Sequence, residues 1–306
     1  VDRNLKEIET LLQLTQTYLK DPLLDDALFE LASSYSRESN TIKAIETYDL
    51  LLSNYKNSPY IPRAGLNKGL ILYNKERYIE AKTILEDIAI KYRRDPVAQQ
   101  AVRTLREIAV DQAEVSAFAQ WVKTQNLNTF SDIELEKTAF TSAEKQFLDG
   151  NTNTAEKLLK EYIETYPQGV FGNPAGFYLA EIYFEKELSI EALPFYQAIV
   201  NQQVSSYTEK SLVRIITLLK KEGRQAESIT YLEKLDQIAS FDENRRFAKL
   251  NLMQAYYASN EFEKTLETAN FVLEIQSLDS TLQWDALILK ARSALMLSDR
   301  LVAATA

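Results

Sequence analysis

The sequence contains no cysteine and no histidine. Their absence excludes disulfide bonds, zinc sites built from these residues, thiol nucleophiles and Ser-His-Asp triads. Glycine and proline are scarce, with 7 of each among 306 residues. Folds that need many tight turns, such as sandwiches, barrels and doubly wound sheets, are therefore disfavoured. Because helix-favouring leucine, alanine, glutamate, lysine and glutamine are abundant, the composition predicts an all-α protein.

Basic residues are fewer than acidic ones. The chain has 35 Lys and Arg against 44 Asp and Glu, a net charge of −9. Since an acidic surface repels phosphate backbones, we expect no nucleic-acid partner. No apolar run approaches the roughly 18–20 residues of a membrane-spanning helix, so no transmembrane segment is expected. The sequence has no phosphate-binding glycine loop and no calcium-loop spacing, so we expect no cofactor and no metal site.

An internal repeat with a period near 37 residues is the main positive feature. Apolar residues three and four apart, separated by polar breaks, form two segments in each repeat, which predicts pairs of amphipathic helices. One column is alanine in five of nine places: Glu7, Ala44, Ala81, Phe118, Ala155, Ala192, Ser228, Thr265 and Ala303. A second column is small in five of eight places: Ala32, Gly69, Arg106, Ala143, Ala180, Ile216, Met253 and Ala291. A third is apolar throughout: Leu11, Tyr48, Leu85, Val122, Leu159, Tyr196, Leu232 and Ala269.

Local signals predict several helix starts. Asp-Pro steps place a proline at the first helical position after Asp21 and after Asp95. A serine followed three residues later by a glutamate predicts a capping box. These pairs are Ser131/Glu134, Ser206/Glu209 and Ser240/Glu243.

One repeat departs from the pattern, because it has Arg106 at the place of the small column and Phe118 at the place of the alanine column, and a polar stretch follows from Lys123. We therefore predict two sub-arrays, residues 1–130 and residues 131–306. The first begins mid-repeat, with a lone second helix over 3–20. The second ends mid-repeat, with a lone first helix over 280–297 and the start of its partner at 299–306. Neither end has the polar cap of a terminal repeat, so we expect the array to continue in a longer protein.

These features resemble the tetratricopeptide repeat (TPR), a helix pair with small, aromatic and alanine signatures. The segment FYLAEIYFEKELSIEALPFYQAIV from Phe177 carries the resemblance most clearly, and it extends over nearly the whole chain. The common form has about 34 residues, and the joints SNYKNSPYIPRA from Ser53 and ETYPQGVFGNPA from Glu164 account for the excess. Such joints resemble the bacterial envelope branch, which includes Tol-Pal-associated periplasmic proteins and outer-membrane assembly lipoproteins. The resemblance implies a right-handed α-solenoid of TPR helix pairs.

In this family the first helices line a concave face that binds a protein or peptide. We predict that six residues of two neighbouring repeats form a partner-binding groove: Phe140, Glu144, Phe147, Phe177, Glu181 and Phe184. Exposed rings would anchor the ligand, and the two carboxylates would favour Lys or Arg on it. Alternatively, the four rings fill the contact between successive repeats. Members that bind chaperone tails carry Lys and Asn at the matching places, so a C-terminal carboxylate ligand is not expected.

The favoured function is a non-catalytic TPR scaffold for protein-protein interactions in a bacterial cell envelope, either periplasmic or associated with the outer membrane. The alternative is a fragment of a cytosolic TPR regulator that senses a peptide in the cytoplasm. Paired carboxylates could serve an α/α-barrel glycosidase, but pairs are unavoidable among 44 acidic residues, and 2 Trp and no His do not indicate a sugar cleft. We therefore predict that the protein is not an enzyme.

Overall fold

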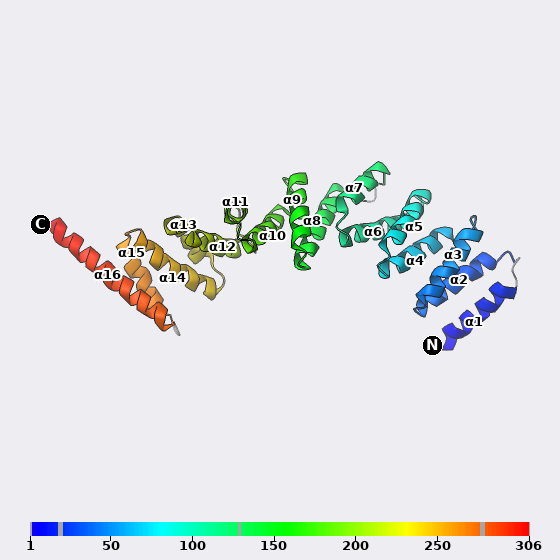
Figure 1. Cartoon of the computed structure of the whole chain (residues 1–306), viewed down its shortest axis with the longest axis horizontal. Coiled ribbons are helices and arrows are strands. Elements are labelled where there is room, and N and C mark those ends of the chain that lie inside the picture. Colours follow the sequence, from blue (N-terminus) through cyan, green and yellow to red (C-terminus); the bar gives the residue numbers. More distant parts are fainter. Residues whose placement is uncertain (1, 18–20, 128–129, 276–278, 306) are drawn as a thin grey trace. The chain divides into compact units, whose positions relative to one another are not determined.

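The computed structural model describes residues 2–17, 21–127, 130–275 and 279–305, and within these ranges it contains helices and no strand. Figure 1 labels the helices in chain order. Their bounds are α1 (Asp2–Thr17), α2 (Leu24–Arg37), α3 (Thr41–Asn54), α4 (Ile61–Asn74), α5 (Tyr78–Lys91), α6 (Pro96–Asp111), α7 (Val115–Thr124), α8 (Asp132–Leu148), α9 (Thr152–Thr165), α10 (Gly172–Glu185), α11 (Ser189–Val200), α12 (Thr208–Lys221), α13 (Gln225–Ile238), α14 (Asp242–Ala258), α15 (Phe262–Leu273) and α16 (Ser280–Thr305).

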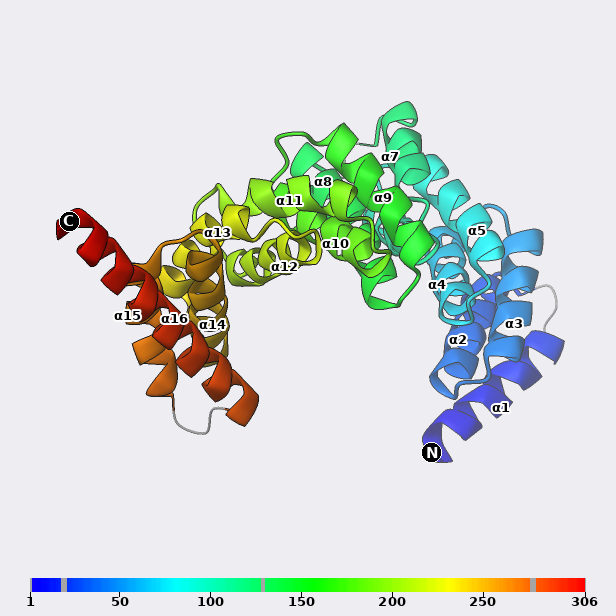
Figure 2. The same ribbon diagram turned by 60° about the vertical axis from the view of Figure 1, so that its left-hand side comes forward.

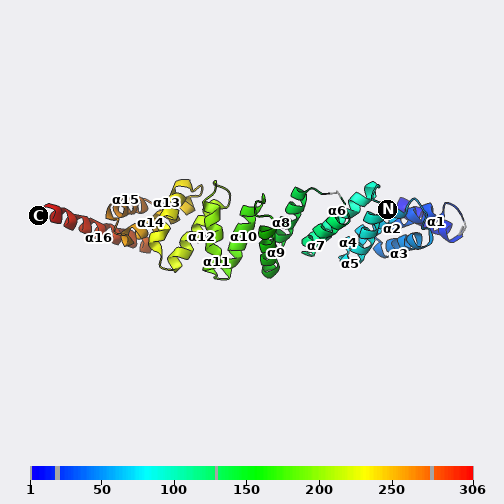
Figure 3. The same ribbon diagram turned by 90° about the horizontal axis from the view of Figure 1, so that it is seen from above.

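Two compact units divide the chain after residue 150. Unit 1 (Val1–Gly150) contains α1 to α8, and unit 2 (Asn151–Ala306) contains α9 to α16. Within each unit, helices that follow one another in sequence pack together. In unit 2, α10, α12 and α14 form one layer and α11, α13 and α15 another (Figure 2), with α12 between α10 and α14 (Figure 3). We call the even-numbered helices from α2 to α14 first helices, and the odd-numbered helices from α3 to α15 second helices.

The predicted all-α array of helix pairs is confirmed. The predicted sub-array boundary near residue 130 falls inside unit 1, and the division into residues 1–130 and 131–306 stays a prediction. The expected second helix at 299–306 is wrong for the described residues, because α16 continues without interruption to Thr305. No glycine or proline lies between Leu297 and Thr305, so the polar residues Ser298, Asp299 and Arg300 are not accompanied by a residue that terminates helices.

Most members of the predicted columns lie in the core, but in the small column Arg106 is half-buried and Ala291 is exposed. Every member of the apolar column from Tyr48 to Ala269 is buried. At the small column, a Cβ added to Gly69 of α4 would lie only 2.6 Å from Leu85 of α5. The Leu85 side chain therefore packs directly against the α4 backbone at Gly69, which a larger residue at this place would prevent.

The turn between a first and a second helix repeats in the backbone itself. One residue in each turn has a left-handed φ, between 57° and 77°. These residues are Ser39, Glu76, Ala113, Gly150, Glu187, Gly223 and Asn260. Successive members are 37 residues apart, except for one step of 36 between Glu187 and Gly223. The repeat period predicted from side chains is thus also present in the backbone, although only two of the seven residues are glycine.

Helix starts agree with the sequence only in part. The capping box of Ser131 and Glu134 is confirmed. Pro96 begins α6, whose N-cap residue Asp95 accepts a hydrogen bond from the Val97 backbone at 2.9 Å. Pro22, in contrast, precedes α2, which begins at Leu24.

The other two predicted capping boxes are wrong. Helix α12 is preceded by Tyr207 and α14 by Phe241, and neither N-cap side chain makes a capping bond. Glu209 instead accepts hydrogen bonds from the Ser240 backbone at 2.8 Å and from Asn244 at 2.7 Å. Its carboxylate therefore links one repeat to the next rather than closing its own helix.

Candidate protein-binding surface

The structure divides the six predicted groove residues between the two units. Phe140, Glu144 and Phe147 lie on α8 of unit 1, and Phe177, Glu181 and Phe184 lie on α10 of unit 2. The rings of Phe140 and Phe177 are each only 5% exposed, whereas Phe147 and Phe184 are half-buried. The expectation that all four rings are exposed is therefore wrong for two of them. Partner binding by the six residues stays a prediction.

Phe177 is buried because the next first helix begins over it. The ring of Tyr207, which precedes α12, lies 4.9 Å from that of Phe177, and the Lys210 ammonium lies 5.1 Å from it. The same arrangement occurs in unit 1: Phe29 of α2 stacks on Tyr60 at 5.0 Å, beneath Arg63 at 5.4 Å. In both places the tyrosine precedes the cation by three residues. For Phe177, the alternative that the ring fills the contact between successive repeats is correct, and the buried Phe29 ring packs in the same way.

Glu181 is the centre of a buried network in unit 2. It is 4% exposed and accepts hydrogen bonds from Tyr196 at 2.6 Å and from Arg214 at 2.9 and 3.0 Å. Lys210 forms an ion pair with the same carboxylate at 2.8 Å. The expectation that Glu181 attracts a basic ligand is wrong, because two cations of α12 already neutralise it.

The network perturbs the acidity of both buried groups. Burial alone raises the pKa of Glu181, but hydrogen bonds from Arg214, Lys210 and Tyr196 outweigh it and lower the pKa to about 2. Burial, and then the hydrogen bond to Glu181, raises the pKa of Tyr196. Glu181 is therefore ionised and Tyr196 is neutral throughout the ordinary pH range.

Acid should weaken unit 2 through Glu181. Because its pKa is about 2 in the folded state and 4.5 for the free side chain, the stabilisation is complete above pH 4.5 and is lost as the pH falls toward 2. The size of the effect is about 3 kcal/mol. We expect the urea midpoint of the unmutated protein to fall more between pH 6 and pH 3 than that of Glu181→Gln. Parallel pH profiles for the two proteins would contradict this.

The outward side of this network is basic and aromatic. The Arg214 guanidinium lies 4.1 Å from the centre of the half-buried Phe184 ring. Lys210 is largely exposed, and further along α12 the exposed Lys220 donates to Asn251 at 3.0 Å and to Gln254 at 3.4 Å on α14. We call Phe184, Lys210, Arg214 and Lys220 the cationic face. Among the residues that the structure describes, Glu181 is the carboxylate that pairs with Lys210 and Arg214, and Lys220 bonds to amides, so the face retains positive charge in an acidic chain.

The sequence analysis missed Arg214 and Tyr207. Their partners lie 33 and 30 residues earlier, at Glu181 and Phe177, on the preceding first helix. Both residues could have been found by searching each first helix for a charge or an aromatic ring that lies 30 to 33 residues after an opposite charge or a ring of the preceding first helix.

The first helices of unit 1 are joined by a different set of groups. Tyr73 of α4 donates to Asp111 of α6 at 2.9 Å, and Lys145 of α8 bonds to the same carboxylate. Burial, followed by this hydrogen bond, raises the pKa of Tyr73 to about 12. The carboxylate is again occupied by groups of its own chain.

Two features are absent from the residues that the structure describes. Among them, no group of three or more His, Cys, Asp or Glu side chains could hold a metal ion. None of the described helices combines the length and the apolar character needed to cross a membrane.

No protein-family model and no curated protein matches the sequence. Solved structures similar to it include a tetratricopeptide repeat protein from Parabacteroides merdae, with 14% identity over 81% of this chain and 90% of that one and a TM-score of 0.36. The C-terminal part of a TPR repeat-containing protein from Cytophaga hutchinsonii has 13% identity over 85% and 99%, with a TM-score of 0.41. The TPR2AB-domain of yeast Sti1, in complex with pHSP90, has 15% identity over 90% and 100%, with a TM-score of 0.39. At such identities and TM-scores, these likenesses establish neither a family nor a partner.

Proposed function

We propose that this chain is a non-catalytic scaffold of the tetratricopeptide type that binds a protein partner through the first helices of unit 2. The cationic face is the observation that carries this proposal. It combines a half-buried ring, Phe184, with the exposed or half-exposed cations Lys210, Arg214 and Lys220. Aromatic residues and arginine are the side chains that most often dominate the energy of protein interfaces.

The charge of the face selects the chemistry of the partner. Glu181 is buried beneath Lys210 and Arg214, so a ligand that approaches from solvent meets positive charge. A partner segment with Asp or Glu beside one apolar side chain would pair with the exposed cations and cover the ring of Phe184. An acidic partner is the opposite of the basic ligand that the sequence alone predicted.

The test uses two labelled peptides of equal length that carry the same Leu and Phe residues. One has Asp and Glu at the remaining places and the other has Lys. We expect fluorescence anisotropy to detect binding of the acidic peptide, weakening as salt is raised from 50 to 500 mM. The double variant Lys210→Ala, Lys220→Ala should bind it about tenfold more weakly, because two partly exposed pairings are lost.

The matched control is Lys157→Ala, which removes an exposed lysine from the second helix α9 of the same unit. It should bind the acidic peptide as the unmutated protein does. Equal affinity for the acidic and basic peptides, or an equal loss in Lys157→Ala, would overturn the proposal.

We also propose that the protein acts in a bacterial cell envelope, in the periplasm or at the outer membrane. The support is the resemblance of the joints from Ser53 and Glu164 to those of envelope TPR proteins. Fractionation of cells that produce the full-length protein tests this directly, and recovery in the envelope fraction is expected. Recovery in the cytoplasm would favour the alternative, a cytosolic peptide-sensing regulator.

A further inference from the structure

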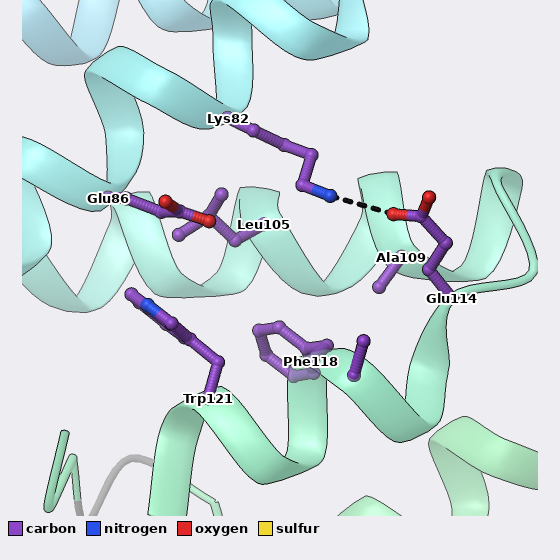
Figure 4. A pocket seen from close by; sticks show the side chains of 8 residues that line it. Lys82, Glu86, Leu105, Ala109, Glu114, Phe118 and Trp121 are labelled. Carbon is purple, nitrogen blue, oxygen red and sulfur yellow. Dashed lines mark hydrogen bonds and ion pairs between the residues drawn. The ribbon is translucent and has the colours of Figure 1, made fainter. Parts of the chain in front are cut away.

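A second site lies in unit 1 and shares no residue with the cationic face of unit 2. Helices α5, α6 and α7 enclose a pocket of about 110 Å³ (Figure 4). Its apolar surface comes from Leu105 and Ala109 of α6 and from Ala117, Phe118 and Trp121 of α7. Lys82 and Glu86 of α5 and Glu114, which precedes α7, line the remainder.

The pocket follows from one departure in the repeat. Phe118 stands where four of the other six second helices carry the fully buried alanines Ala44, Ala81, Ala155 and Ala192, and where α13 and α15 carry the small buried residues Ser228 and Thr265. A benzyl group at this place prevents the close approach of the second helix that alanine allows. The same repeat has Arg106 at the small place of α6, where its guanidinium lies 5.3 Å from the ring of Phe130, and that ring meets Phe118 edge-on. The space between α6 and α7 is thus built into the sequence of this repeat.

The charged side chains that line the pocket differ in whether they have a partner. At one end, Lys82 and Glu114 form an ion pair at 2.7 Å, so their charges compensate each other. The Glu86 carboxylate points into the pocket near Trp121 (Figure 4), and no described side chain pairs with it. The Trp121 ring lies 6.2 Å from that of Phe118, nearly parallel to it, and is half-buried. An indole, an apolar floor and one uncompensated carboxylate therefore converge on a single small space.

We propose that this pocket binds the lysine side chain of a protein partner. A pocket of about 110 Å³ has room for the end of one side chain and not for a longer peptide segment. The outer methylenes of lysine would cover Leu105 and Phe118, while the ammonium would meet Glu86 and the Trp121 ring. A carboxylate ligand would face Glu86 without compensation. This site is independent of the function proposed for unit 2, since it shares no residue with the cationic face.

Small probes test the chemistry on a protein with one tryptophan. Trp284 is 66% exposed, so Trp284→Phe should fold normally and leave Trp121 as the only indole N–H signal in a nitrogen-15 NMR spectrum. The probes are the N-acetyl amides of lysine, norleucine, Nε-acetyl-lysine, arginine and glutamate. We expect the lysine probe to shift the Trp121 signal with a dissociation constant on the order of millimolar. The other four should bind at least fivefold more weakly.

Three substitutions locate the interaction. Glu86→Gln should remove the preference for the lysine probe over the norleucine probe. Ala109→Leu should fill the pocket and abolish the shift from every probe. Asp87→Asn makes the same charge change one residue further along α5, where Asp87 pairs with Lys91 rather than lining the pocket, and it should leave the lysine shift unchanged.

The five probes can be compared on the Trp284→Phe protein alone. This comparison tests whether the pocket prefers lysine even if a pocket variant fails to fold. No shift at 50 mM lysine probe overturns the proposal. An equal shift from norleucine shows an apolar hole without charge selection, and a stronger shift from arginine or glutamate assigns different chemistry; each outcome also overturns it.

Discussion

Replacing Glu181 with serine is expected to destabilise unit 2 by about 3 kcal/mol, because Arg214 and Lys210 would lose the buried carboxylate that compensates them. The hydroxyl of Tyr196, which is fully buried, would also lose its acceptor. For a unit of this size, the thermal midpoint should fall by roughly 6–12 °C. Circular dichroism at pH 7 measures the change.

Unit 1 has uncharged residues at the places that correspond to this network. They suggest a double substitution that should restore stability. Ser33, Tyr48 and Asn67 of unit 1 stand at the places of Glu181, Tyr196 and Arg214, which lie 148, 148 and 147 residues later. There the Tyr48 hydroxyl meets Ser33 at 3.2 Å and accepts from Asn67 at 3.1 Å. The double variant Glu181→Ser, Arg214→Asn should therefore recover most of the stability that Glu181→Ser loses.

The single variant Arg214→Asn, together with Glu181→Ser and the double variant, gives a double-mutant cycle that measures the coupling between Glu181 and Arg214. Additive losses in the three variants would mean that Glu181 and Arg214 stabilise the unit independently, and this would contradict the network described above. A coupling of about 2 kcal/mol or more is the expected result.

Ala180→Trp is expected to be at least as damaging, with a loss of about 3 kcal/mol or more. Ala180 is fully buried in the column of small residues, at the place of Gly69, where a side chain of the paired helix packs directly against the backbone. An indole there must either push α10 away from α11 or enter a strained rotamer. Urea unfolding followed by circular dichroism measures the loss.

The control for this substitution is Glu185→Trp, which places the same ring on the exposed side of α10. It should leave the urea midpoint nearly unchanged. If Ala180→Trp were equally silent, the assignment of the small column to the contact between paired helices would be incorrect.

The fold was predictable because its determinants lie within one repeat. Ala44, Tyr48 and Leu51 are one helical turn apart and lie in the core as the periodicity predicts. Composition and spacing are sufficient for such local patterns, and the same rules identified the cap at Ser131.

The candidate surface was less predictable, because it depends on pairs that join different repeats. The burial of Phe177 depends on Tyr207, and the charge of Glu181 depends on Arg214. Neither partner is adjacent in sequence, and no helical period connects them. The departure at Phe118 was visible in the sequence, but the pocket that it opens also requires Lys82 and Glu86 from the preceding repeat.

The left-handed turns bear on how the chain folds. Five of the seven turn residues are not glycine, and each stores on the order of 1 kcal/mol of backbone strain. An isolated helix pair is therefore weak by itself, and its stability comes from the neighbours on either side. In a one-dimensional array, weak units joined by strong interfaces fold and unfold together over long stretches. The repeated strain in the turns thus favours cooperative folding over the gradual fraying of single pairs.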